Sequence, residues 1–244
     1  MAPLSAPPIV VVKSSSAATR VANAVRNVPQ LDQDTTVALD TVAAHVGQIG
    51  DPYPEPIYGT VADHFAASSS SRSRLALLAH LVKMVDAKSI LEIGTAYGMS
   101  AIAMAKAQEK PALITVDGFE PQISISRQLF RAIFPDGGVE QIAGDKSEVI
   151  ALLVRDGRRF DFVLHDGGHD GDAYVRDFAD MLPSLTRSSL LLIDDIDWDC
   201  TPEVRARTSH SRRTCYEGWR EVAQHDRVEG AIEIRGKLGI VLVR

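Results

Sequence analysis

The sequence is poor in cysteine, and its two cysteines lie in one polar segment. Among 244 residues there are only Cys200 and Cys215. Two cysteines cannot build the disulfide framework of small secreted domains, and their spacing matches no zinc-binding array. The first residues lack the basic segment and long apolar stretch of a typical secretory signal. We therefore expect a cytoplasmic protein in a reducing environment.

Long apolar runs and an excess of positive charge are also absent. No apolar stretch approaches the ~20 residues that cross a bilayer as a helix, so the sequence predicts no membrane span. Lysine and arginine number 26 against 32 aspartates and glutamates, which gives a formal net charge of −6. We do not expect general binding to nucleic acid, because phosphate backbones attract basic surfaces.

What is present fits one globular α/β domain with an N-terminal extension. Hydrophobic residues make up 45% of the chain and charged residues 24%, which is typical of such domains. Residues 1–20, rich in Pro, Ser and Ala, predict a flexible arm unless the apolar run 9–12 docks elsewhere. Residues 21–67 predict a helical extension, since apolar positions recur at helical spacing between Ala17 and Ile49 and the proline-rich segment 51–56 is an extended linker.

Strand and helix patterns alternate through residues 68–244. A run of serines precedes the amphipathic segment 72–85, which predicts a capped helix. Alternation of this kind predicts a parallel sheet with helices on both faces. Near the end, two apolar runs flank Gly236-Lys237, which predicts a hairpin and an antiparallel last strand. The expected strands are 89–93, 113–116, 139–143, 160–165, 189–193, 231–235 and 238–243, and the expected helices after the first are 99–106, 122–134, 148–154 and 173–182.

A glycine-bracketed turn follows the first of these strands and predicts a cofactor loop. The turn reads Glu-x-Gly-x-x-x-Gly from Glu92 to Gly98, with Gly94 between them. Ligands of open α/β sheets bind beyond the carboxyl ends of the strands, where glycine lets a backbone approach them closely. Asp117 ends the second strand, a position from which a carboxylate can bind two ribose hydroxyls. The spacing differs from the dinucleotide Gly-x-Gly-x-x-Gly, so a nicotinamide or flavin enzyme is disfavoured.

The pair Gly144-Asp145 follows the third strand and has two open interpretations. A side chain at this point of the sheet can reach the amino group of an adenine. Asp145 can equally cap the helix that begins near Glu148, and the two roles are compatible.

Three carboxylates follow two later strands and predict a cation site. Asp166 comes after the strand 160–165, and Asp194 and Asp195 come after the strand 189–193. Converging carboxylates repel one another unless a cation neutralises them. Oxygen ligands favour Mg²⁺ or a similar divalent ion. The alternative is that Asp194 or Asp195 caps the segment after it.

Two histidines flank Asp166. His169 lies three residues after it and is the candidate general base, because an imidazole titrates near neutrality. The competing interpretation is an ordinary surface or hydrogen-bonding histidine. His165 lies within the strand, where a buried, hydrogen-bonded side chain is expected instead of a ligand.

Together these residues resemble the class I methyltransferases, and within them the metal-dependent O-methyltransferases similar to catechol O-methyltransferase, over about Ser68 to Arg244. The resemblance implies S-adenosylmethionine as methyl donor, Mg²⁺, and the sheet order 3-2-1-4-5-7-6. In that family an Asp after the fourth strand and an acidic pair after the fifth bind the metal, and 28 residues separate Asp166 from Asp194 as they do there. The catechol-type base is a lysine at the place of His169, so the chain departs from the family here. The expected cofactor-binding residues are Glu92, Gly94, Thr95, Gly98, Ser100, Asp117, Gly118, Gly144, Asp145 and Asp166.

The motifs Asp166-Gly-Gly-His169 and Ile193 to Trp198 look most like the bacterial branch that modifies sugars and secondary-metabolite scaffolds. The resemblance therefore implies a small hydroxylated acceptor, and a homodimer is a family expectation. Trp198 and Tyr58 are candidates for stacking on the acceptor or for packing. The basic segment 200–215 either covers an acidic acceptor or is a solvated loop. Rival hypotheses are a metal-independent N- or O-methyltransferase and a non-catalytic cofactor-binding module.

Overall fold

A computed structural model describes residues 8–55, 57–109, 112–199, 211–234 and 237–244. Its centre is one eight-stranded sheet in the order β1-β7-β8-β6-β5-β2-β3-β4. The pairs formed among β2 to β6 are parallel, whereas β8 runs antiparallel to both of its neighbours. The strands are β1 Ile9–Lys13, β2 Ser89–Ile93, β3 Ala112–Asp117, β4 Val139–Ala143, β5 Phe160–His165, β6 Leu185–Ile193, β7 Val228–Ile234 and β8 Leu238–Val243.

The predicted sheet order is confirmed for the seven strands from β2 to β8. Numbered from β2, they run 3-2-1-4-5-7-6, with the last strand antiparallel. Strand β6 begins at Leu185, four residues before the predicted start at Ser189, because a short 3₁₀ turn, Leu182–Ser184, leads directly into it. The predicted hairpin turn falls partly on residues 235–236, which lie outside the described part of the chain.

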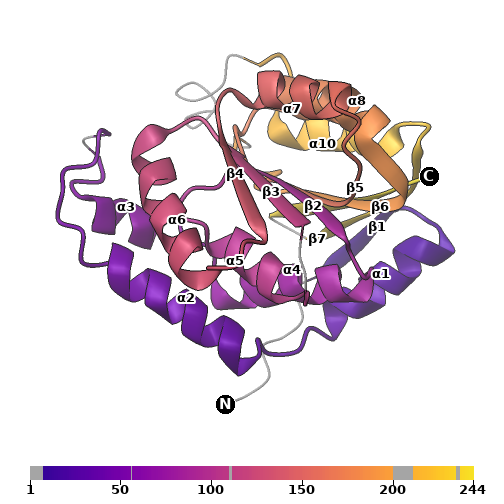
Figure 1. The fold of residues 1–244 in the computed structure, drawn as a ribbon. Helices are drawn as coiled ribbons and strands as arrows, with labels where there is room; N and C mark the ends of the chain where they lie inside the picture. The colour runs from indigo at the N-terminus through magenta and orange to yellow at the C-terminus, as the bar shows by residue number, and fades with distance from the viewer. Residues whose placement is uncertain (1–7, 56, 110–111, 200–210, 235–236) are drawn as a thin grey trace.

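Helices cover both faces of the sheet, and each face has its own apolar core. Figure 1 shows α7, α8 and α10 over one face and α1, α4 and α5 over the other, with α2 outside them. Apolar strand residues alternate between the two cores, as the pleat of a strand requires. The helices are α1 Ser16–Arg26, α2 Gln33–Val46, α3 Val61–Ser68, α4 Arg72–Met84, α5 Met99–Lys106, α6 Glu120–Ile133, α7 Lys146–Arg155, α8 Gly171–Met181 and α10 Cys215–Gln224.

The expectation of a free arm over residues 1–20 is wrong for its described part. Residues 9–13 form β1, which pairs antiparallel with β7 at the edge of the sheet. Ser15 caps α1 by accepting a hydrogen bond from the backbone N–H of Ala18, and Val21 of that helix is buried. The docking of 9–12 that the sequence left open therefore occurs, because the exposed edge of β7 offers backbone partners and the neighbouring core offers an apolar surface.

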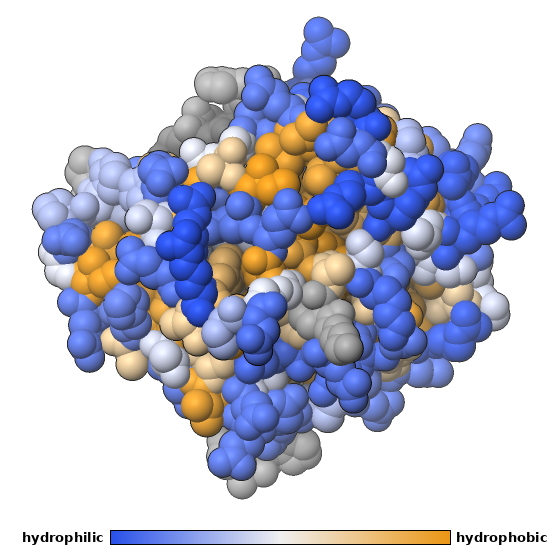
Figure 2. Space-filling model, in the orientation of Figure 1, coloured by the Kyte–Doolittle hydropathy of each residue, from blue (hydrophilic) through white to orange (hydrophobic). Residues whose placement is uncertain are grey.

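The surface in the orientation of Figure 1 is mostly hydrophilic, with apolar side chains gathered near the centre of the view (Figure 2). Within the described residues, no helix has both the length and the apolar character needed to cross a membrane.

Two glycines bring α8 and α10 into backbone contact beside the loop that leads out of β5. A Cβ on Gly218 of α10 would lie 2.2 Å from the carbonyl oxygen of Gly171, the first residue of α8. Because the atoms that this Cβ would meet belong to the backbone of Gly171, no rotation of a side chain could relieve the clash. The crossing therefore fixes where α8 begins, two residues after His169.

We expect Gly218→Ala to lower the free energy of unfolding by ~1–3 kcal/mol, the usual cost of overpacking a tight contact. Urea denaturation followed by circular dichroism measures it. Gln224→Ala, at an exposed position of the same helix, is the matched control and should change stability by less than ~0.5 kcal/mol. Equal stability of Gly218→Ala and wild type would contradict the close crossing.

Candidate functional site

The turn after β2 is held in place by the acid at the end of β3. The carboxylate oxygen Oδ2 of Asp117 accepts hydrogen bonds from the backbone N–H groups of Thr95, at 2.9 Å, and Ala96, at 2.8 Å. Its other oxygen, Oδ1, accepts from the N–H of Phe119 at 2.9 Å. The predicted ribose-binding acid therefore lies directly against the glycine turn, at the carboxyl edge of the sheet.

The two glycines of the turn make room for protein atoms. Both have left-handed backbones, with φ of +96° at Gly94 and +85° at Gly98. A Cβ on Gly94 would lie 2.4 Å from the carbonyl oxygen of Asp166, and one on Gly98 would lie 2.6 Å from the Phe130 ring. Packing within the chain therefore already requires both glycines, whereas the sequence predicted them from the close approach of a ligand.

Glu92 is fully buried beneath the turn. The Thr115 hydroxyl donates a hydrogen bond to its carboxylate at 2.5 Å, and the hydroxyls of Thr115 and Thr95 are 2.6 Å apart. Burial raises the pKa of Glu92 to about 7, although hydrogen bonds from Ser100 and Thr115 oppose the shift. These polar groups join the ends of β2 and β3 to the first turn of α5.

The third strand ends beside the second at two glycines. The N–H of Gly144 donates to the carbonyl of Asp117 at 2.9 Å, and a Cβ on Gly118 would be 3.4 Å from the Gly144 carbonyl oxygen. Asp145 caps α7 by accepting hydrogen bonds from the backbone N–H groups of Ser147 and Glu148. Of the two open interpretations of Asp145, the cap is observed, and the adenine contact stays a prediction.

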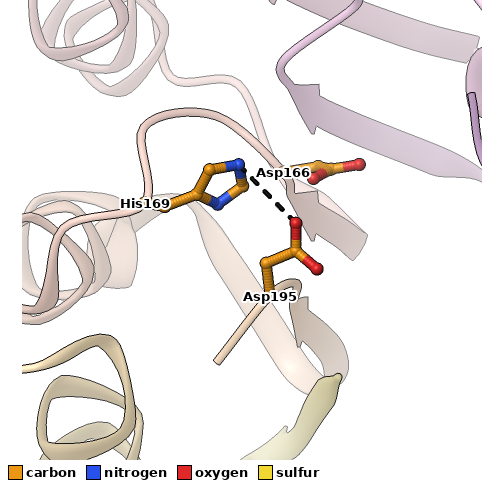
Figure 3. Close-up of side chains that lie close together, drawn as sticks. All are labelled: Asp166, His169 and Asp195. Atoms are coloured by element: carbon orange, nitrogen blue, oxygen red, sulfur yellow. Dashed lines mark ion pairs between the residues drawn. The ribbon is translucent and has the colours of Figure 1, made fainter. Parts of the chain in front are cut away.

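The carboxyl ends of β5 and β6 bring the predicted acids together, but the acids have different partners. Asp194, only 5% exposed, pairs with Arg74 from the first turn of α4. Asp195 has a left-handed backbone with φ of +47°, and its carboxylate lies 3.2 Å from Lys237 Nζ and 3.7 Å from His169 Nε2. Figure 3 shows the His169 ring and the Asp195 carboxylate facing each other, with Asp166 beside them.

Among the residues that the structure describes, Asp166, His169 and Asp195 form a group whose composition fits a metal ion. One possible ligand atom from each lies within 4.8 Å of the others. Carboxylate oxygens and an imidazole nitrogen are ordinary ligands of divalent ions. When bound, such an ion would lower the pKa of a hydroxyl beside it and hold that hydroxyl in place. Sequence reasoning missed Arg74, because a lone arginine in an amphipathic helix carries no signal of its distant partner.

The electrostatics of the group follow from burial. Burial and then the charge of Asp194 raise the pKa of Asp166 well above its usual value. Burial also raises the pKa of Asp194, against the opposing charge of Arg74. Burial lowers the pKa of His169, against the charge of Asp195. Burial thus favours the uncharged imidazole, which has a nitrogen lone pair available.

His165 belongs to a separate buried network, as the sequence indicated. Its Nε2 lies 2.9 Å from the Asp177 carboxylate, which also pairs with Lys146 Nζ at 2.7 Å. Despite burial, the hydrogen bond from His165 and the charge of Lys146 keep the pKa of Asp177 below its usual value. Lys146 also donates to the Gly167 carbonyl at 2.9 Å, so this network supports the loop that carries Asp166 and His169.

The other candidates divide into packed and undescribed residues. Trp198 lies against His169, with ring centroids 4.8 Å apart, and Tyr58 packs edge-on against Tyr53 and His64. Of the basic segment 200–215, Arg213 pairs with Asp172 and Glu221, while positions 200–210 lie outside the described residues. The described end of the segment is thus bound to the surface of the protein.

The central part of the chain matches a known protein family. Residues 91–196 match the family model of a methyltransferase domain. This span is therefore similar to a methyltransferase domain. It begins in β2 and ends just beyond β6, so it contains both the glycine turn and the acidic residues. The predicted enzyme class is confirmed. A search of curated proteins gives no match.

Solved structures with this methyltransferase fold align along nearly the whole chain. The Podospora anserina methyltransferase PaMTH1, bound to S-adenosylhomocysteine, has a TM-score of 0.68 at 18% identity, covering 95% of this chain and 97% of that one. A Bacillus cereus O-methyltransferase in complex with the same molecule gives 0.63 at 17% identity, covering 94% and 98%. TomG, an O-methyltransferase of tomaymycin synthesis from Streptomyces achromogenes, gives 0.61 at 18% identity, covering 94% and 96%. These likenesses establish the fold.

We expect Asp166→Asn to stabilise the ion-free protein at pH 8 and to leave its stability unchanged at pH 4. The pKa of Asp166 is raised in the folded state, so its ionisation destabilises the wild type as pH rises above the unfolded value of ~3.9. The thermal midpoint in chelator should rise by about 2–4 °C at pH 8, the shift that ~1 kcal/mol produces in a chain of this size. Asp136→Asn, at an exposed site, is the control. A lower midpoint for Asp166→Asn at pH 8 would contradict the assignment.

Proposed function

We propose that the protein transfers the methyl group of S-adenosylmethionine to a hydroxyl of a small molecule, with the help of a divalent cation such as Mg²⁺. One observation carries the proposal. The turn held by Asp117 lies at strand ends adjacent to those that carry the group of Asp166, His169 and Asp195. The carbonyl oxygen of Asp166 lies where a side chain on Gly94 would be. Donor and acceptor would therefore meet at one edge of the sheet.

The donor half is supported by the geometry around Asp117. Its carboxylate lies beside the glycine turn and accepts hydrogen bonds from two backbone N–H groups there. Two ribose hydroxyls could donate to the same carboxylate, either in addition to these N–H groups or in their place. Binding of S-adenosylhomocysteine by the similar Podospora and Bacillus proteins, and of S-adenosylmethionine by TomG, agrees with this assignment.

The acceptor half requires that a hydroxyl lose its proton. In the reaction the oxygen bonds to the methyl carbon, the carbon–sulfur bond breaks, and the products are a methyl ether and S-adenosylhomocysteine. A divalent ion would supply the lowered pKa of the hydroxyl, and Asp166 and Asp195 would hold it. Burial favours the neutral form of His169, whose free ring nitrogen could either accept that proton or bind the ion.

A second function is favoured by one observation. Arg74 already supplies a positive charge beside Asp194, so part of the acidic charge is neutralised without an ion. This pairing supports the alternative of a metal-independent methyltransferase that acts on oxygen or nitrogen. The two functions differ in whether a chelator abolishes turnover.

We expect S-adenosylhomocysteine to bind the purified protein, and Asp117→Asn to weaken that binding by at least tenfold. The substitution removes the charge that favours the ribose hydroxyls, a loss of about 1.4 kcal/mol or more, since hydrogen bonds to charged groups contribute about 1.5–3 kcal/mol. Isothermal titration calorimetry gives both dissociation constants. The exposed Asp136→Asn variant should bind like wild type. If folded wild type does not bind at all, the enzyme proposal fails.

We expect methylation of hydroxylated acceptors to require a divalent ion and to fall about 100-fold in Asp166→Asn. A screen of catechols, sugars and phenolic natural products, with Mg²⁺ or with a chelator, measures formation of S-adenosylhomocysteine. Loss of positioned charge at a reacting group commonly costs this much. Full turnover in chelator would instead support the metal-independent function, whereas donor binding without turnover on any acceptor would favour a non-catalytic module.

A further inference from the structure

We propose that His169 is a ligand of the cation and not the general base. The ion is held by Asp166, His169 and Asp195, while Asp194 stays in its ion pair with Arg74. The proposal deepens the proposed function and rests on it for the presence of an ion. It replaces the trio of aspartates expected from the sequence with two carboxylates and one imidazole. Such a set favours a transition-metal ion over Mg²⁺.

Arg74 takes Asp194 out of the ligand set. The guanidinium reaches Asp194 from α4 and is itself largely buried, with a side-chain exposure of 15% against 7% for Asp194. One Asp194 oxygen also accepts a hydrogen bond from the N–H of Asp195 at 2.6 Å. Breaking a buried ion pair leaves an uncompensated charge, which costs several kcal/mol. Each oxygen of Asp194 therefore already has a partner, with which an ion would have to compete.

The surroundings of His169 select the tautomer that a metal ligand needs. The Tyr174 hydroxyl donates its proton to the Asp194 carbonyl at 2.9 Å. Its oxygen, 3.5 Å from His169 Nδ1, is therefore left to accept a hydrogen bond from that nitrogen. A proton on Nδ1 leaves the lone pair on Nε2. Ligating histidines are commonly fixed in this way, by a partner for the second ring nitrogen.

The lone pair of Nε2 points into the acidic group. It lies 3.7 Å from Asp195 Oδ2, with the Asp166 carboxylate completing the set within 4.8 Å. Two ligands ~2.0–2.2 Å from a common ion lie about 3–4 Å apart, so small side-chain rotations would close the site. The indole of Trp198 packs on the imidazole and restricts its rotation. A base would need Nε2 to face the acceptor hydroxyl, whereas here it faces a carboxylate.

An imidazole changes which ions the site prefers. Mg²⁺ favours oxygen ligands and keeps several waters, whereas nitrogen ligands suit later first-row ions such as Co²⁺, Ni²⁺ and Zn²⁺. We use Co²⁺ as the probe, because its affinity rises with nitrogen ligation and its visible absorption reports its ligands. The full chain, freed of metal by a chelator, is titrated with Co²⁺ or Mg²⁺ in a calorimeter and a spectrophotometer.

We expect Co²⁺ to bind at least tenfold more tightly than Mg²⁺, and His169→Gln to reduce that ratio by at least tenfold, since an amide oxygen replaces the nitrogen. The Co²⁺ absorption band should shift in the same variant. His45→Gln, at an exposed position of α2, is the matched control and should behave as wild type. Equal binding of the two ions, no binding of either, or a ratio unchanged in His169→Gln would overturn the proposal.

A double variant, Arg74→Met with Asp194→Asn, tests the place of Asp194 without leaving a buried charge unpaired. It should keep Co²⁺ affinity within about threefold of wild type, and a larger loss would put Asp194 among the ligands and overturn the proposal. Circular dichroism melts confirm that each variant folds. Binding of S-adenosylhomocysteine is measured on the same samples. If it persists while the ion preference fails, this inference alone is wrong, and if it is absent, the proposed function is wrong whatever the ions do.

Discussion

The glycine turn and the acidic loop share one backbone contact, and the arrangement of the site follows from it. The carbonyl of Asp166 occupies the space that a side chain on residue 94 would fill, and the N–H of Asp166 donates to the carbonyl of Ile93 at 2.8 Å. The ends of β2 and β5 are therefore locked together at the level of the main chain. Because Asp117 holds the same turn from the other side, three neighbouring strand ends act as one rigid edge. A pocket built on such an edge is largely formed before any ligand arrives.

Much of this arrangement could be predicted from the sequence because its causes are local. Apolar runs such as 89–93 and 160–165 identify strands, and polar residues directly after them must lie at the carboxyl edge of a parallel sheet. The starts of two helices could be predicted for the same reason, since Ser71 and Asp145 cap the helices that follow them. The sheet order came from the family resemblance, and no periodicity in the chain specifies it.

What could not be predicted depends on partners far apart in the chain. Residues 9–13 contain a short apolar run within an arm rich in Pro, Ser and Ala, and its partner, β7, lies more than 200 residues later in the chain. Likewise, three aspartates in sequence look equivalent, and only the fold shows that Arg74 faces one of them. The packing reason for Gly94 could not be predicted either, because no local sequence pattern indicates that the carbonyl of Asp166 packs against it.

The pairing of Arg74 with Asp194 ties together two elements that evolution could otherwise vary independently. Helix α4 precedes β2, whereas Asp194 follows β6. A substitution at either residue alone would leave the other buried charge without its partner. Related sequences should therefore replace both residues together, for example by an uncharged pair. Proteins that keep the arginine and those that lose it would then form separate lineages, each with its own number of free acids at this edge. In an alignment of relatives, the residue at position 74 would thus indicate how many carboxylates after β6 are unpaired and can bind an ion.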